Sequence, residues 1–170
     1  MLGAWLLLDG CNHNQVDPPT ANDTREVYRP IYSSYEAVRT IQTQAPRAIR
    51  QAGKIYIKDG FLFVNEIGAG IHIVDNRKPD KPVKLSFISI PGARELAIKD
   101  SILYADNAVD LVALNVANPQ NVRLMKRIEN AYPKSSYPPQ RNVRFECPDS
   151  GKGLVVGWIK SEDKDVNCWR

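Results

Sequence analysis

Five residues in this sequence belong to the types that most often ligate metals or carry thiol chemistry. They are the cysteines Cys11, Cys147 and Cys168 and the histidines His13 and His72. A structural zinc site usually takes four Cys or His ligands at tight local spacing, and no Cys-x-x-Cys pair occurs here. The spacing therefore predicts no metal site, and three cysteines are too few for a disulfide scaffold.

Catalytic motifs are equally sparse. No Gly-x-Ser-x-Gly nucleophile elbow occurs. The glycines of Glu66–Gly70 suggest a phosphate loop, but such a loop must lead into a helix, and a strand-like segment follows here. We expect a tight turn there and a packed side chain at His72, which lies within an apolar run. The residues predict no catalytic centre and no cofactor.

Two other sets of side chains have both a chemical and a structural interpretation. The first set is Asp75, Asp106 and Asp110, and the second is Tyr56, Phe63 and Tyr104. The aspartates could converge on a cation, but capping of the corners between strands explains each one more simply. The aromatic residues could line a sugar-binding groove, but at strand positions they usually pack in the core.

Composition is that of an ordinary globular domain. The chain has 170 residues, of which 43% are hydrophobic and 25% charged, and its net charge is +4. This length suits one modest domain with flexible ends. Lys and Arg are scattered, whereas a nucleic-acid-binding protein normally shows a basic stripe with interleaved aromatic residues. We therefore expect no nucleic-acid partner.

The amino terminus has the pattern of a lipid-attachment site. An apolar run over Leu2–Leu8 ends at Gly10-Cys11 and is too short to span a bilayer. An apolar run, a small residue and then a cysteine resemble the end of a bacterial lipoprotein signal peptide, which implies lipidation of Cys11. Asp9 departs from that pattern, and no Lys or Arg precedes Cys11, as expected if translation starts upstream of Met1. The alternative is a buried strand that ends in a free thiol.

A repeat occupies the middle of the chain. IKDGFLFVN at Ile57–Asn65 returns as IKDSILYAD at Ile98–Asp106, at an offset of 41 that becomes 40 after a one-residue adjustment. Hydrophobic pattern and turn residues predict four short strands in each copy. The expected strands are 54–58, 61–66, 70–75 and 83–90, then 95–99, 102–106, 110–115 and 122–128. A four-stranded repeat of this length is typical of a β-propeller blade.

Turn chemistry supports this division into strands. Asp59-Gly60 favours a type I′ hairpin, because that turn needs φ > 0 at both central residues, and Asp100-Ser101 is a weaker version. At the corner after 70–75, the Asp75 side chain can bind nearby backbone amides, and Asn115 can do the same at the equivalent corner of the second copy.

These residues resemble a known repeat family. Gly70–Asp75 with Pro79 and Pro82 resembles the LVIVD repeat of bacterial lipoproteins, and Leu111–Asn115 resembles a drifted second copy. The resemblance covers about 53–133. It implies propeller-like blades and a cell-envelope location, expected to be the outer membrane, and it offers no enzyme site.

The expected fold is mainly β, a partial β-propeller of two four-stranded blades with a short helix and irregular flanks. Residues 1–11 form the signal-peptide remnant and 12–52 a polar tether with the short helix. Two repeats follow at 53–133, divided into 53–92 and 93–133, and 134–170 form a proline-rich loop, one further strand and a frayed tail. Two blades cannot close a ring. Either the chain is the amino-terminal portion of a longer protein, or its open blade faces self-associate or bind a partner.

The flanks show weaker signals. Ser33-x-x-Glu36 has capping-box spacing and predicts a helix over 34–41. A loop is expected over 133–141, a strand over 153–159 and fraying after Lys160.

An envelope location would permit a disulfide between Cys147 and Cys168. The loop it closes, 148–167, is worth about 3 kcal/mol in the chain-entropy model. Two free thiols are the simpler expectation, because Cys168 lies two residues from the end of the given sequence, and Gly151 and Gly153 weaken any fixed geometry.

The expected function is that of a non-catalytic cell-envelope lipoprotein, held on the membrane by its lipid, with a propeller-like surface that binds protein or glycan. An envelope hydrolase whose site needs further blades, and a truncated structural fragment, remain as alternatives.

Overall fold

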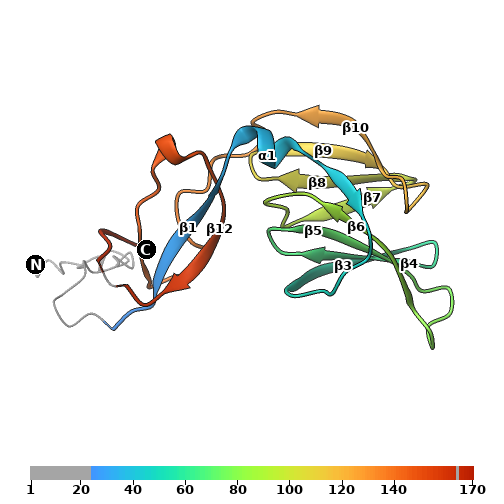
Figure 1. Cartoon of the computed structure of the whole chain (residues 1–170), viewed down its shortest axis with the longest axis horizontal. Helices are drawn as coiled ribbons and strands as arrows, with labels where there is room; N and C mark the ends of the chain where they lie inside the picture. Colours follow the sequence, from blue (N-terminus) through green and yellow to red (C-terminus); the bar gives the residue numbers. More distant parts are fainter. Residues whose placement is uncertain (1–23, 164) are drawn as a thin grey trace, which may run out of the picture.

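The computed structural model describes residues 24–163 and 165–170. This part of the chain is mainly β and forms three sheets, none of them closed. Figure 1 shows the sheets of β3–β6 and β7–β10 stacked at one end, with β1 and β12 at the other. In chain order the elements are β1 (Val27–Ser33), α1 (Tyr35–Arg39), β2 (Gln42–Gln44), β3 (Ala52–Lys58), β4 (Phe61–Glu66), β5 (Gly70–Asp75), β6 (Val83–Ser89), β7 (Leu96–Lys99), β8 (Ile102–Asn107), β9 (Asp110–Asn115), β10 (Arg123–Ile128), β11 (Arg144–Phe145), a 3-10 turn (Ser150–Lys152), β12 (Leu154–Ser161) and β13 (Cys168–Trp169).

The first repeat folds as the antiparallel strands β6-β5-β4-β3, and the second has the order β10-β9-β8-β7. Strand β2, in the segment expected to be a polar tether, pairs with β6 and adds a fifth strand to the first sheet. The eight expected strands are present, each with ends within two residues of the prediction. Asp59 and Gly60 have φ of 51° and 78°, as a type I′ turn requires. Of the pair at the equivalent turn, only Asp100 has positive φ, at 53°.

The corners after β5 and β9 are built alike, as expected. Asp75 Oδ1 accepts a hydrogen bond from Arg77 N at 3.0 Å, and Asn115 Oδ1 accepts one from Ala117 N at 2.9 Å. Each side chain thus takes the place of a backbone acceptor and turns the chain.

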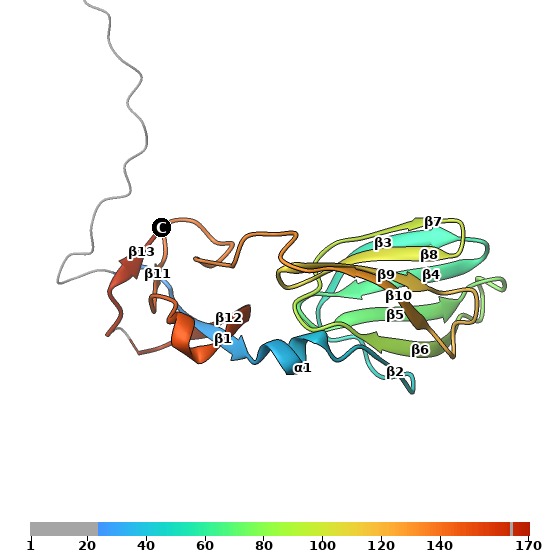
Figure 2. The same ribbon diagram turned by 90° about the horizontal axis from the view of Figure 1, so that it is seen from above.

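The main core lies between one face of each repeat sheet; Figure 1 shows the two sheets one above the other, and Figure 2 shows that they overlap when viewed from above. It contains Phe63, Ile71, Ile73 and Ile88 from the first repeat, and Ile98, Leu103, Ala105, Val112 and Leu114 from the second. Strands β4, β5, β8 and β9 supply most of these residues, which explains the near-continuous apolar run of β5.

A third sheet, of order β12-β1-β11-β13, corrects two expectations. Residues 27–33, expected within the polar tether, form β1, which pairs antiparallel with β12 and parallel with β11. The tail after Lys160, expected to fray, contains β13, which pairs with β11. The partners are far apart in sequence, so no local pattern revealed these pairings. The expected strand over 153–159 is β12, and 133–141 contain no strand.

Helix α1 is shorter than expected and begins one residue later. Its N-cap is Ser34, whose Oγ accepts a hydrogen bond from Ala37 N at 3.1 Å. Ser33, the expected cap, is instead the last residue of β1 and pairs with Leu154. Strand pairing therefore overrides the capping-box spacing.

Candidate functional site

Two of the three cysteines form a disulfide. Cys147 and Cys168 are joined with an S–S distance of 2.05 Å and a Cα–Cα distance of 5.3 Å. Cys168 pairs with Phe145 in the β11–β13 ladder, which places its sulfur beside Cys147. The expected lipidation site, Cys11, lies outside the described residues. No helix of the described part is both long enough and apolar enough to span a membrane.

One face of the second repeat lies open. In the first repeat, the face that packs on the second repeat carries Phe61, Phe63, Ile71, Ile73 and Ile88. At offsets of 41 and 40, the same positions of the second repeat are Ile102, Tyr104, Leu111, Ala113 and Ile128. We call these five residues the open face. They are apolar or aromatic, as their equivalents are.

The two copies of this face differ in how much of their side chains is exposed to solvent. Phe63 is 4% exposed and Ile88 is 0% exposed, whereas Tyr104 is 39% and Ile128 48% exposed. The difference arises because the second repeat covers the first, while no described sheet covers the second. The opposite face of the second repeat, with Leu103 and Val112, is fully buried against the first repeat.

The connection between β2 and β3 covers the middle of the outer face of the first repeat, whereas Ile55 and Ile57 on the edge strand β3 remain 58% and 69% exposed. This connection crosses from one edge of the sheet to the other, because β2 pairs with β6 and β3 lies at the far edge. Its Arg47 guanidinium lies 3.9 Å from the centroid of the Phe87 ring. Lys84 Nζ donates to Arg47 O, and Ile67 N donates to Gln51 O.

A buried hydrogen bond between His72 and Glu66 lies beneath Arg47. His72 Nε2 is 2.5 Å from Glu66 Oε2, and Arg47 Nη2 is 3.2 Å from the same oxygen. Burial is the largest influence on the pKa of Glu66 and would raise it, but His72 and Arg47 together outweigh burial and hold the pKa below its usual value. His72 is 1% exposed and also packs on Phe87, as the packed interpretation expects.

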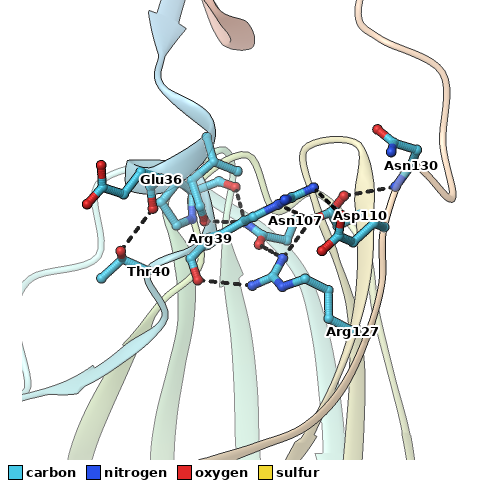
Figure 3. Close-up of polar contacts among 10 residues, drawn as sticks. Glu36, Arg39, Thr40, Asn107, Asp110, Arg127 and Asn130 are labelled. Carbon is cyan, nitrogen blue, oxygen red and sulfur yellow. Dashed lines mark hydrogen bonds and ion pairs between the residues drawn. The ribbon is translucent and has the colours of Figure 1, made fainter.

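A second buried carboxylate, Asp110, lies in a larger network (Figure 3). Its Oδ2 accepts hydrogen bonds from Arg127 Nη1 at 2.8 Å and Arg39 Nε at 3.0 Å, and its Oδ1 accepts one from Asn130 N at 2.9 Å. Burial alone would raise the pKa of Asp110, but Asn130, Arg39 and Arg127 lower it below its usual value. Asn107 joins the network by accepting from Arg127 at 2.6 Å.

The two networks occupy equivalent places. Glu66 and Asn107 are equivalent at an offset of 41, and both lie at the end of the second strand of their repeat. Both carboxylates are neutralised by an arginine from the segment before the first repeat: Arg47 pairs with Glu66, and Arg39 pairs with Asp110. Since these carboxylates are already paired with arginines, the networks fasten the amino-terminal segment to the sheets.

The three aspartates singled out as a cation site have separate partners. Asp75 pairs with Arg77, Asp106 accepts from the backbone amides of Arg94 and Glu95, and Asp110 lies in the network above. The described residues contain no group of three acidic, His or Cys side chains arranged to hold a metal.

The three aromatic residues singled out as a sugar groove are also dispersed. Phe63 is in the core, and Tyr56 donates its hydroxyl to Ile98 O at 3.1 Å between the two repeats. Tyr104 lies on the open face.

A pocket of about 550 Å³ lies where the second repeat meets the third sheet. Its walls come from the start of the second repeat, the β8–β9 turn, the proline-rich loop, β12 and the last residue. The side chains most relevant to binding are Arg94, Glu95, Asp106, Tyr132, Lys134, Tyr137 and Arg170. Sequence reasoning missed the two tyrosines, although each stands directly before a proline in the 132–139 stretch.

Asp106 has the most constrained carboxylate in this pocket. Its Oδ1 accepts hydrogen bonds from the backbone N–H groups of Arg94 and Glu95, both at 2.8 Å. Burial raises the pKa of Asp106 above its usual value, against the lowering effect of these amides. The side chain is thus fixed in orientation at the pocket wall.

No family model, no curated protein and no solved structure matches the chain.

Proposed function

We propose that the chain is a non-catalytic lipoprotein of the bacterial cell envelope, on the outer membrane, whose two repeats are LVIVD-type propeller blades. The open face of the second blade binds a further four-stranded blade. The equivalence of the two faces carries this proposal: Phe63, Ile71 and Ile88 pack against a neighbouring sheet, and Tyr104, Leu111 and Ile128 repeat them without one.

Stacked repeats explain why such a face exists. In repeat proteins each unit contacts its neighbours, and a terminal unit needs a polar outer face to remain soluble. Over the middle strands of the first repeat, the covering segment with Arg47 and Lys84 meets this need, while Ile55 and Ile57 of the edge strand β3 stay exposed. The second repeat has no such cover among the described residues, so its open face is an interface and not a cap.

Two observations support the proposed envelope location and lipid attachment: the sequence around Cys11 and the disulfide between Cys147 and Cys168. The apolar run that ends in Gly10-Cys11 has the pattern of a lipoprotein signal. The Cys147–Cys168 bond supports an oxidising compartment, where disulfides persist. A lipid on Cys11 would then hold the body at the membrane without a spanning helix.

A non-catalytic role is supported by the side chains that general acid–base chemistry would need. His72 is the only histidine among the described residues, and it is buried and bonded to Glu66. The buried carboxylates Glu66 and Asp110 are both neutralised by arginines.

The test uses the full chain with Cys11→Ser, so that it carries no lipid. Light scattering after size exclusion should show self-association that grows with concentration, because the open face lacks its neighbour. Tyr104→Lys should reduce this association, whereas Ile159→Lys, at a more exposed apolar position on β12, should leave it unchanged. A compact monomer that melts cooperatively, or equal effects of the two variants, would contradict the proposed interface.

A further inference from the structure

We propose that the pocket between the second repeat and the third sheet binds an uncharged oligosaccharide. The pocket is separate from the open face, and neither its lining nor its chemistry enters the proposal above. Its volume of about 550 Å³ lies within the range of roughly 300–1,000 Å³ that is typical of small-molecule sites.

Two tyrosines supply the apolar contact that a sugar needs. Tyr132 is 42% exposed and Tyr137 is 52% exposed, and both line the pocket. The carbon-bound hydrogens of a pyranose form an apolar surface that packs on an aromatic ring. Aromatic side chains bury a large area with little loss of conformational freedom, so they are effective where the ligand is otherwise polar.

The tyrosine-bearing loop is held in place by its neighbours. The Arg170 guanidinium stacks 3.9 Å from the centroid of the Tyr137 ring and donates to Pro138 O at 2.5 Å. Trp158 Nε1 donates to Ser135 Oγ at 3.2 Å, and Tyr132 N donates to Val109 O at 2.9 Å. A loop that is ordered before binding costs less to immobilise when ligand arrives.

Polar groups in the wall suit hydroxyl groups. Asp106 Oδ1 is held by two backbone amides, which leaves Oδ2 as an acceptor of fixed direction. Arg94, whose guanidinium makes no hydrogen bond to other described residues, lines the same pocket and supplies donors. A sugar hydroxyl both donates and accepts, so one hydroxyl pair can satisfy both groups.

The charges in the wall favour an uncharged ligand. Arg94, Lys134 and Arg170 are cationic, while Glu95 and Asp106 are acidic. Glu95 also forms an ion pair with Lys54. A phosphate or carboxylate ligand would be attracted by the cationic side chains but repelled by the Asp106 carboxylate. A cationic ligand would be repelled by the arginines. A neutral polyol avoids both penalties.

The experiment screens the full-length protein with Cys11→Ser on an array of neutral and acidic oligosaccharides. Binders are then titrated by calorimetry and by Trp158 fluorescence, since Trp158 contacts the pocket residue Ser135. We expect saturable binding of a neutral oligosaccharide. Tyr132→Ala should weaken it by about ten-fold or more, in line with the loss of one aromatic contact. Asp106→Asn, which keeps Oδ1 as an acceptor for the two amides, should weaken it similarly.

Tyr104→Ala is the matched control, because Tyr104 is as exposed as Tyr132 but lies on the open face. It should alter self-association and leave saccharide affinity unchanged, so the two proposals can fail independently. The saccharide proposal is overturned if no neutral oligosaccharide binds, if acidic saccharides or inorganic phosphate bind better, or if Tyr132→Ala and Asp106→Asn bind as well as the parent.

Discussion

At the residue scale, two carboxylates carry charge into the interior of the protein. Glu66 and Asp110 are both nearly inaccessible, and each is balanced by at least one arginine. A buried charge without its partner is far costlier than an exposed one, because the interior cannot replace the lost hydration. These two residues are therefore the places where single substitutions should act most strongly.

Removing the Asp110 carboxylate should destabilise the protein. Asp110→Ala leaves Arg127 and Arg39 without their shared partner and Asn130 N without an acceptor. We expect a loss of about 3–5 kcal/mol in the free energy of unfolding, measured by urea denaturation. Asp163→Ala, which removes an exposed partner of Arg29, should cost no more than about 1 kcal/mol. Equal losses in the two variants would refute the structural role of the network.

Acid should weaken the fold through the same carboxylates. The pKa values of Glu66 and Asp110 in the folded chain lie below the values of 4.5 and 3.8 expected without the fold. Their stabilisation is complete above those values and is lost as pH falls through the folded pKa values. Asp106 opposes them, because its pKa is raised and its contribution is lost as pH rises.

We therefore expect the free energy of unfolding to fall by roughly 1–3 kcal/mol between pH 6 and pH 3. Asp110→Asn should flatten this dependence, since the amide does not titrate in that range. Urea midpoints at each pH provide the measurement, and an unchanged slope in the variant would rule out Asp110 as a source.

At the element scale, the junction between β4 and β5 depends on one glycine. Gly70 has φ of +148°, and a Cβ there would lie 2.0 Å from Ile88 O. Gly70→Ala should therefore cost about 2 kcal/mol or more, because backbone must move. In the control, Gly157→Ala on β12, the nearest atom is Ile31 Cδ1 at 3.4 Å, and we expect a change below about 1 kcal/mol. Thermal unfolding of both variants measures this difference, and equal losses would show that the close approach of Gly70 to Ile88 O does not limit stability.

The third sheet depends on its disulfide to hold the short strands β11 and β13. Each has two residues, and Arg170 N and Val143 N exchange hydrogen bonds with the opposite carbonyls beside them. Cys147→Ser with Cys168→Ser should lower stability by about 3 kcal/mol in the chain-entropy model. Hydrogen exchange at Arg170 N should accelerate, while exchange in β5 should not.

Mass spectrometry of protein purified without reductant gives an independent result. A two-hydrogen deficit that links the peptides of Cys147 and Cys168 is expected, and complete alkylation of both thiols in the native protein would exclude the bond.

At the scale of the whole molecule, the described part of the chain consists of a stacked pair of repeat sheets and a third sheet that joins β1 to the strands β11–β13. Helix α1 connects them, because Arg39 reaches Asp110 while Ser33 pairs with Leu154. The proposed saccharide pocket lies at this junction, and the open face lies on the second repeat. The two proposed binding surfaces of the described body are thus separate from each other.

Membrane attachment is the prediction that belongs to the whole molecule. Cys11→Ser, in a gene that retains its natural upstream sequence, should release the protein from sedimented membranes, because the thiol that accepts the lipid is gone. Incorporation of a fatty-acid analogue into the parent and not into the variant provides the check. Unchanged sedimentation of the variant would remove the support for a lipid anchor.

The sequence by itself determined the two repeat sheets. Their strands follow one another directly, and local signals mark each boundary: Asp59-Gly60 fixes a hairpin, and Asp75 and Asn115 turn the corners. Because β3–β6 and β7–β10 each pair with their neighbours in sequence, alternation and turn chemistry were sufficient for these eight strands. Strand β2, which pairs with the distant β6, was not predicted. His72 was also predicted correctly as packed, since its apolar neighbours place it in a buried strand.

Only the tertiary structure decided the third sheet, the disulfide and the pocket. Arg29 and Asp163 form an ion pair across 134 residues of sequence. Strand β1, which carries Pro30, belongs to no sequence repeat, so the sequence does not indicate which strands pair with it. Proximity to the end of the given sequence favoured free thiols, but the pairing of Cys168 with Phe145 of β11 positions it for the disulfide. Tyr132 and Tyr137 become wall residues only because Val156 and Arg170 come to face them. Such sites depend on contacts between segments distant in sequence, and local propensity does not encode those contacts.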